Sequence, residues 1–153
     1  MKTETNKLFE QLTERFRGLP GVEVPPRIYI EMGAELVDYQ ENQSVTIKFP
    51  NKPKYRNPVG HMQGGVIVAA IDNTYGPLSY LVAPPSATTQ INTQYIRPVL
   101  AEDKFIEVSA SLIERTKTQI LMRAEVRNEE KKLVAVSQAT HQIILREPTT
   151  RQL

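Results

Sequence analysis

Cysteine and tryptophan are absent from this sequence, and only two of its 153 residues are histidines. The absence of cysteine excludes thiolate catalysis, cysteine-ligated zinc and a disulfide scaffold together. Charge of one sign is also scarce, because 19 lysines and arginines against 17 aspartates and glutamates leave a formal net charge of +2. Since the basic residues are scattered as well, we expect no nucleic-acid partner.

Long hydrophobic runs are missing too. No stretch approaches the roughly 20 apolar residues that cross a membrane, and no signal-peptide hydrophobic region follows residues 1–7. We therefore expect a cytoplasmic protein with no membrane partner. The length suits one domain, residues 1–153, and 40% hydrophobic with 24% charged residues is the composition of an ordinary globular protein.

The N-terminal pattern predicts a short helix at about residues 5–17, packed at the edge of the domain. Apolar residues recur there every four positions, at Leu8, Leu12 and Phe16. The proline-rich segment 20–34 that follows is ambiguous, with only a weak apolar alternation at its end.

Alternating apolar and polar residues predict an antiparallel sheet. Residues 36–39 and 45–49 form a hairpin around a polar turn. Further strands, each with one apolar face, are expected at about 89–95, 106–112, 120–126 and 133–145. Short turns join the last three as consecutive hairpins, which only an antiparallel sheet permits.

Segment 63–82 differs from the rest of the chain. Residues 66–71 are apolar on every side of a helical wheel, which predicts a helix buried all round. Five or six antiparallel strands and one such helix favour an α+β fold in which the sheet curls around the helix.

Gly64 and Gly65 open this helix. Glycine there permits a ligand to approach the free backbone N–H groups of a helix start. The pair is equally compatible with a sharp turn and tight packing against the sheet. Both interpretations stay open, because two glycines are a weak motif.

Asp72 is the sharper signal, since an ionised carboxylate on a buried helix costs several kcal/mol unless it has a partner. Alternatively, the helix breaks near Asp72 and Pro77 kinks it. Eight residues at about 1.5 Å each place Asp72 roughly 12 Å from Gly64 along the axis. The two therefore act on different groups, or a second copy of the chain brings its own Asp72 to this helix start.

Other chemistry is poorly supported. His61 and His141 have no further ligand at a recognisable metal-binding spacing, and no Gly-x-Ser-x-Gly elbow indicates a serine triad. We expect neither metal nor cofactor. Arg115 and Lys117 lie in a predicted turn that is either simply solvated or suited to a phosphate.

The run Asn57-Pro-Val-Gly-His-Met-Gln-Gly-Gly65, followed by Ile71-Asp72-Asn73, resembles the hotdog-fold acyl-CoA thioesterases. The branch with phenylacetyl-CoA and 4-hydroxybenzoyl-CoA thioesterases is the nearest in pattern. The likeness continues through residues 92–98 and 114–116 and covers Asn57 to Ile144. It implies a hotdog fold, a long central helix wrapped by an antiparallel sheet, and a homodimer that is often doubled into a homotetramer.

The resemblance also implies roles for individual residues. The amide of Gly64 or Gly65 would polarise a thioester carbonyl, and Asp72 of the partner subunit would act as general base or nucleophile. Asn57 would help to hold the thioester or the water, and Thr88 would orient that water.

Three cationic or titratable residues are the nearest candidates for binding the acyl-CoA substrate: Arg115 and Lys117 for the phosphates, and His61 beside the glycines. Relatives often have histidine immediately before the glycine pair, where this chain has Gln63. Glutamine can donate a hydrogen bond to a carbonyl but cannot titrate near neutrality, so a mechanism that relies on Asp72 is favoured.

The resulting prediction is an acyl-CoA thioesterase that releases a carboxylic acid and CoA. A non-catalytic acyl-CoA or acyl-carrier binding module is the alternative, and a hotdog dehydratase or hydratase is less favoured because Gln63 replaces the histidine. The acyl pocket is expected to involve Val66, Ile67, Leu78, Tyr80 and residues 83–86.

Overall fold

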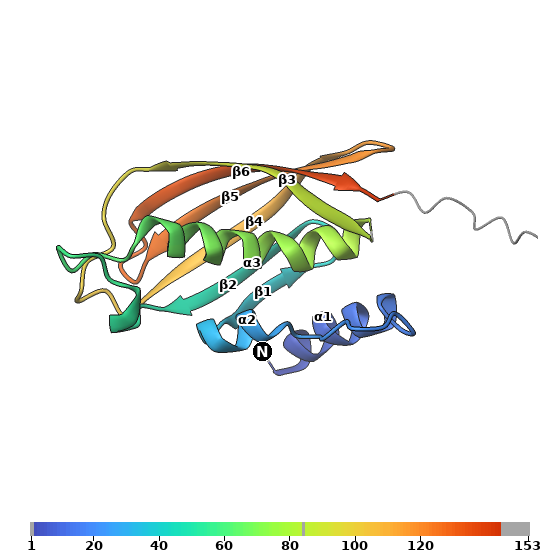
Figure 1. Cartoon of the computed structure of the whole chain (residues 1–153), viewed down its shortest axis with the longest axis horizontal. Coiled ribbons are helices and arrows are strands. Elements are labelled where there is room, and N and C mark those ends of the chain that lie inside the picture. Colours follow the sequence, from blue (N-terminus) through green and yellow to red (C-terminus); the bar gives the residue numbers. More distant parts are fainter. Residues whose placement is uncertain (1, 84, 145–153) are drawn as a thin grey trace, which may run out of the picture.

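A single curled sheet dominates the computed structural model, which describes residues 2–83 and 85–144 (Figure 1). The sheet has six antiparallel strands in the order β1-β2-β4-β5-β6-β3. The strands are β1 (Glu35–Gln40), β2 (Ser44–Pro50), β3 (Ser86–Tyr95), β4 (Phe105–Arg115), β5 (Gln119–Asn128) and β6 (Leu133–Ile143). Its concave face holds the long helix α3 (Gly64–Val82), so the predicted sheet wrapped around one helix is confirmed.

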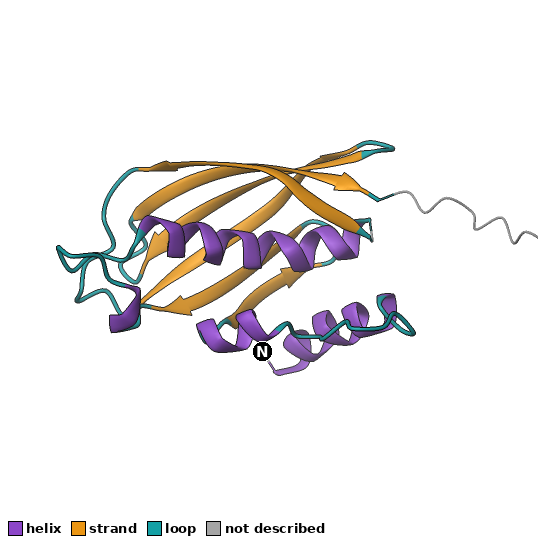
Figure 2. Cartoon of the chain, viewed as in Figure 1, coloured by secondary structure: helices purple, strands orange, loops and turns teal. Residues whose placement is uncertain are grey.

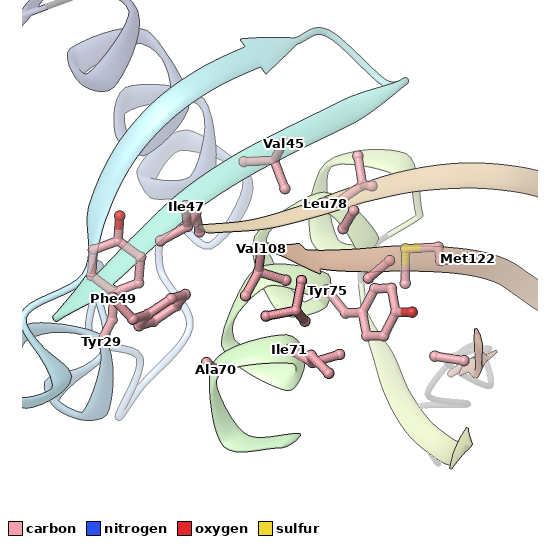
Figure 3. Close-up of a cluster of buried hydrophobic side chains, with 14 of the residues drawn as sticks. Tyr29, Val45, Ile47, Phe49, Ala70, Ile71, Tyr75, Leu78, Val108 and Met122 are labelled. Atoms are coloured by element: carbon pink, nitrogen blue, oxygen red, sulfur yellow. The ribbon is translucent and has the colours of Figure 1, made fainter. Parts of the chain in front are cut away.

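The core forms where α3 meets the sheet. Ile71, Tyr75 and Leu78 of α3 are fully buried and face side chains from three strands (Figure 3). These partners are Val45, Ile47 and Phe49 of β2, Val108 of β4 and Met122 of β5. Burying each such side chain contributes about 1.5–3 kcal/mol, which makes this helix face the main anchor of the fold.

The sheet does not cover the opposite face of α3, and part of that face is exposed, so the prediction of a helix buried all round is wrong. Gly65 and Asp72 are exposed, and Val68, Ala69 and Gly76 are only partly buried. These positions recur at helical spacing and form one stripe along the helix. The sheet curls around only one side of α3, and an apolar sequence does not reveal which side that is.

Helix α3 is continuous through Asp72, so the alternative of a helix break there is wrong. The side chains that follow bond within the helix instead of capping a new one. Asn73 donates from Nδ2 to the Ala69 carbonyl at 2.9 Å, and Thr74 donates from Oγ1 to the Ala70 carbonyl at 2.8 Å.

None of the helices in the described residues is long and apolar enough to cross a membrane.

Two further helices lie beyond the β1 edge of the sheet, beneath α3 in the view of Figure 2. Helix α1 spans Lys2–Arg15 and helix α2 spans Arg27–Met32, within the ambiguous segment. Leu8 and Leu12 of α1 are buried, and the ring of Phe16 packs edge-on against Tyr80 of α3 with centroids 5.0 Å apart. The N-terminal region therefore covers part of α3 that the sheet leaves open.

Strand β3 pairs with β6, although β4 and β5 separate the two in sequence. The consecutive hairpins β4–β5 and β5–β6 agree with the predicted turns. The expected apolar face on β3 is wrong, because most of its residues are exposed and only Ser86 is buried. As an outer strand, β3 is covered by a neighbour on one edge only.

Candidate active site

Five of the nine predicted site residues line two separate hollows within one chain, whereas Gln63, Gly65, Arg115 and Lys117 line neither hollow. The helix-start hollow, of about 370 Å³, is lined by Asn57, His61, Gly64 and Tyr95, together with residues 96–99. The Asp72 cavity, of about 660 Å³, lies between α3 and the N-terminal region and is lined by Asp72 and Thr88, among others.

Asn57 organises the loop that leads into α3. Its side-chain Oδ1 accepts hydrogen bonds from the backbone N–H of Val59 at 3.1 Å and of His61 at 3.0 Å. The backbone N–H of Asn57 donates to the His61 carbonyl at 2.8 Å. The side-chain oxygen is thus occupied in closing the loop. The side-chain NH₂ group of Asn57 therefore remains available to donate a hydrogen bond to a ligand.

Gln63 is the N-cap residue of α3, but its exposed side chain makes no capping bond. Its carbonyl accepts the N–H groups of Val66 and Ile67 at 2.9 and 3.3 Å. The amides of Gly64 and Gly65 precede these and have no intrahelical acceptor, as at every helix start. Two donors therefore point out of the helix start beside the hollow.

The two glycines differ in their surroundings. A Cβ on Gly64 would lie 3.0 Å from the hydroxyl oxygen of Tyr95, which donates to the Gly64 carbonyl at 2.8 Å. A Cβ on Gly65 would meet nothing within 4 Å. Tight packing accounts for Gly64, whereas Gly65 faces open space. Tyr95 was not predicted as a site residue, because strand periodicity does not show that β3 passes the start of α3.

Asp72 and Thr88 lie together, although one is on α3 and the other on β3. The Thr88 hydroxyl donates to Asp72 Oδ1 at 3.1 Å. Asp72 is exposed, so the expectation of a costly buried carboxylate is wrong. The uncovered stripe of α3 explains this exposure. A hydroxyl that bonds one carboxylate oxygen leaves the second oxygen available to another group.

His141 is a third member of this group, although its sequence position suggested only a metal ligand. It pairs with Thr88 across the β3–β6 ladder, lines the Asp72 cavity and is 2% exposed. Burial lowers the pKa of His141 below its ordinary value of 6.5, and the opposing effect of the Asp72 charge is smaller. The imidazole is therefore neutral at neutral pH.

No metal centre forms among the described residues, where no three potential His, Asp or Glu ligands gather. His61 lines the helix-start hollow and His141 lines the Asp72 cavity, so the two histidines do not make a pair.

Arg115 and Lys117 are exposed at the β4–β5 turn and line neither hollow. The strand register joins Arg115 to Ile120, Ile120 to His141, and His141 to Thr88 in one row across the sheet. The turn consequently lies at the Thr88 end of the sheet, opposite the start of α3 (Figure 1).

The expected acyl-pocket residues are divided as well. Tyr80, Pro85 and Ser86 line the Asp72 cavity, and Ile67 lines the helix-start hollow. Leu78 is fully buried in the core, and Val66 is partly buried against it. Pro84 lies outside the described residues.

The family model of the thioesterase superfamily matches residues 59–135, about half of the chain. This range includes Gly64, Gly65, Asp72 and Thr88 and ends before His141. A comparison with curated proteins finds no match.

Several solved structures are similar to this chain. The E. coli PaaI protein, from the phenylacetic acid degradation operon, has a TM-score of 0.75 at 14% identity, with 90% of this chain and 96% of that chain covered. The Haemophilus influenzae thioesterase HI1161 has a TM-score of 0.73 at 20% identity, with 94% of each chain covered. Conserved protein PA5202 of Pseudomonas aeruginosa has a TM-score of 0.70 at 25% identity, with 78% and 94% covered. The expected hotdog fold is confirmed.

Proposed function

The chain belongs to the thioesterase superfamily, and from this premise we propose that it hydrolyses acyl-CoA thioesters at a site built by two copies of the chain. The observation that carries the proposal is the Asp72–Thr88 hydrogen bond on the uncovered stripe of α3. It holds an exposed carboxylate in a fixed orientation, which is what a base acting on water requires.

The separation of the two hollows supports the need for a second copy. Gly65 and Asp72 belong to one helix, about 10 Å apart along its axis, and neither hollow includes both. A twofold axis near Val68 and Ala69 would bring Gly65 of one chain opposite Asp72 of the partner subunit. Such a contact is self-complementary, as twofold interfaces are, and would cover the uncovered stripe of α3.

In the proposed reaction, Asp72 accepts a proton from water while the water oxygen attacks the thioester carbon. The negative charge that develops on the carbonyl oxygen is held by the amides at Gly64 and Gly65 of the other chain. The C–S bond then breaks, and the proton held by Asp72 passes to the CoA sulfur. Thr88 keeps one carboxylate oxygen engaged, so the other faces the water.

The remaining predicted residues have supporting roles in this proposal. Asn57 shapes the loop and offers its amide NH₂ group, while Gln63 and His61 flank the amide donors. Arg115 and Lys117 lie at the Thr88 end of the sheet, where two cations would attract the CoA phosphates.

The first prediction concerns Asp72→Asn, measured by thiol release from a panel of acyl-CoA esters. Removing a positioned base lowers turnover by about 10²- to 10⁴-fold, while the melting temperature and CoA-ester affinity stay close to those of the parent. Asp38→Asn on β1 is the matched control and should keep the parent rate, since Asp38 lines neither hollow.

Equal turnover by the parent and by Asp72→Asn would contradict the assignment of the base. If the parent binds acyl-CoA esters but releases no thiol from any of them, the protein is an acyl-CoA binding module. An enoyl product in place of free acid would indicate dehydratase chemistry.

A further inference from the structure

The Asp72 cavity is apolar over most of its wall but polar on one side. Its apolar wall comes from the N-terminal region and from α3, and includes Leu12, Phe16, Val24, Ala69, Pro77 and Tyr80. With a volume of about 660 Å³, it falls in the range of small-molecule pockets. Polar residues of β3 and β6 form the polar side, and α3 adds Asp72, Asn73 and Ser79 to the lining.

Two buried polar atoms on that polar side have no hydrogen-bond partner among the described residues. They are Oγ of Ser86, a residue that is 5% exposed, and Nε2 of His141, which is 2% exposed. Both residues line the Asp72 cavity. A buried polar group without a partner costs about 1–3 kcal/mol, so two such groups in residues that line one cavity favour a polar occupant.

The strand register places these atoms beside the proposed reaction centre. Thr88 is directly opposite His141, and Ser86 precedes Thr88 by two residues and so faces the same side of the sheet. Directly opposite residues have Cβ atoms about 5 Å apart, and diagonal neighbours about 7 Å. Since Thr88 donates a hydrogen bond to Asp72, Ser86 and His141 are close neighbours of the carboxylate.

A neutral imidazole and a serine hydroxyl together provide both a donor and an acceptor. This combination matches an alcohol, which also donates and accepts, and the donor alone matches a ketone oxygen. A plain hydrocarbon chain in the cavity would leave both groups unpaired. Sites built to bond a substrate hydroxyl discriminate strongly against analogues that lack it.

We propose that Ser86 and His141 bind an oxygen substituent, a hydroxyl or a keto group, on the second or third carbon of the acyl chain. The pair thereby determines substrate specificity, with the hydrocarbon remainder against the apolar wall. This inference rests on the proposed thioesterase function and names the substrate class for the same site.

The test compares two esters that differ by one hydroxyl, 3-hydroxybutyryl-CoA and butyryl-CoA, by their ratio of kcat/KM. The parent favours the hydroxy ester. Ser86→Ala and His141→Phe each lower this preference by about 3- to 10-fold, the effect of one lost hydrogen bond. Ser79→Ala is the matched control, because Ser79 lines the same cavity but its hydroxyl already donates to the Gly76 carbonyl at 2.9 Å. That variant leaves the ratio unchanged.

Melting curves identify any variant that fails to fold, and Ser86→Ala, which removes one atom, carries the test if His141→Phe does not fold. His141→Gln retains an amide donor and restores part of the preference. A parent ratio near one that neither variant changes would overturn the inference and indicate that the orphan atoms bind only water.

The proposed function fails separately, if the parent hydrolyses neither of these two esters nor any other ester of the acyl-CoA panel. In that case the same ratio is measured from the dissociation constants of the two CoA esters. An equal affinity of the parent for both esters would overturn the role of Ser86 and His141 in selecting the acyl group.

Discussion

At the residue scale, burial and pairing separate the roles of three neighbouring groups. Asp72 is exposed and receives one hydrogen bond, Thr88 donates that bond, and His141 is buried with an unpaired ring nitrogen. The exposed position of Asp72 lets a water molecule reach its second carboxylate oxygen, as a base acting on water requires. A histidine held neutral by burial serves as a hydrogen-bonding group instead.

A prediction at this scale concerns the pH dependence of stability. Because the pKa of His141 is lowered in the folded chain, the unfolded chain binds this proton more readily below the ordinary value of 6.5. The stability linked to His141 is therefore fully present above 6.5 and is lost as the pH falls towards the folded pKa. Between about pH 7 and about pH 5, His141→Phe should show a weaker fall in melting temperature than the parent.

Asp72→Asn provides the opposite control for this pH dependence, since the Asp72 charge partly offsets the lowering of the pKa of His141. Its removal should make the fall in melting temperature steeper. Identical pH profiles for the parent and His141→Phe would show that His141 does not contribute.

At the scale of elements, the start of α3 combines a structural glycine with an open one. Gly64 lies against Tyr95 of β3, and this contact fixes how the helix start meets the strand. Gly65 has no such neighbour, so packing within one chain does not require a glycine there. A close approach of a ligand or of the partner subunit provides a reason for it.

Gly65→Ala tests this distinction. Alanine is the better helix former by up to about 1 kcal/mol, so the free energy of unfolding should stay the same or rise. The added methyl group obstructs the two amides, and turnover should fall about 10-fold or more because oxyanion stabilisation is lost. Denaturant unfolding and thiol release on one preparation check both effects.

Gly64→Ala is the comparison for this experiment. Its methyl group would displace the Tyr95 hydroxyl of the same chain, whereas the methyl group of Gly65→Ala would meet only a bound ligand or the partner subunit. An unchanged turnover in Gly65→Ala would exclude a close approach at that position.

At the scale of the whole molecule, the amide donors and the carboxylate lie at different places along one helix, and a twofold pair would bring them together. The uncovered stripe of α3 and the outer strand β3 are the surfaces that one chain leaves without cover. Joining two stripes would bury apolar area and complete two sites at the same time.

Complementation tests this assembly. Chains with Asp72→Asn are refolded together with chains carrying Gly65→Ala. In a mixed pair, one site contains both substitutions and the other contains neither, so random pairing should recover about a quarter of the parent activity. Each variant refolded alone is the control. No recovery, with mixed pairs demonstrated by differently tagged chains, would mean that every chain holds a complete site.

Local periodicity was sufficient for α1, α3 and the strands, but not for α2, which lies in the ambiguous segment 20–34. The alternation of β2, β4 and β5 and the apolar run of α3 indicate strands and a helix because neighbours two to four residues apart share a face. The helical rise alone places Asp72 too far from Gly64 for the two to meet. The N-terminal helix ends at Arg15, earlier than the expected end near residue 17, and the ring of Phe16 in the following turn packs against Tyr80.

The tertiary structure alone decided which distant residues meet. Strand β3 lies beside β6, and this pairing brings Ser86 and Thr88 next to His141. The uncovered side of α3 and the N-terminal wall of the Asp72 cavity follow from packing between segments far apart in the chain. Periodicity shows which face of an element is apolar. Which element packs against that face depends on contacts between residues far apart in the sequence, where the entropy lost in closing the loop is set against the energy of the contact.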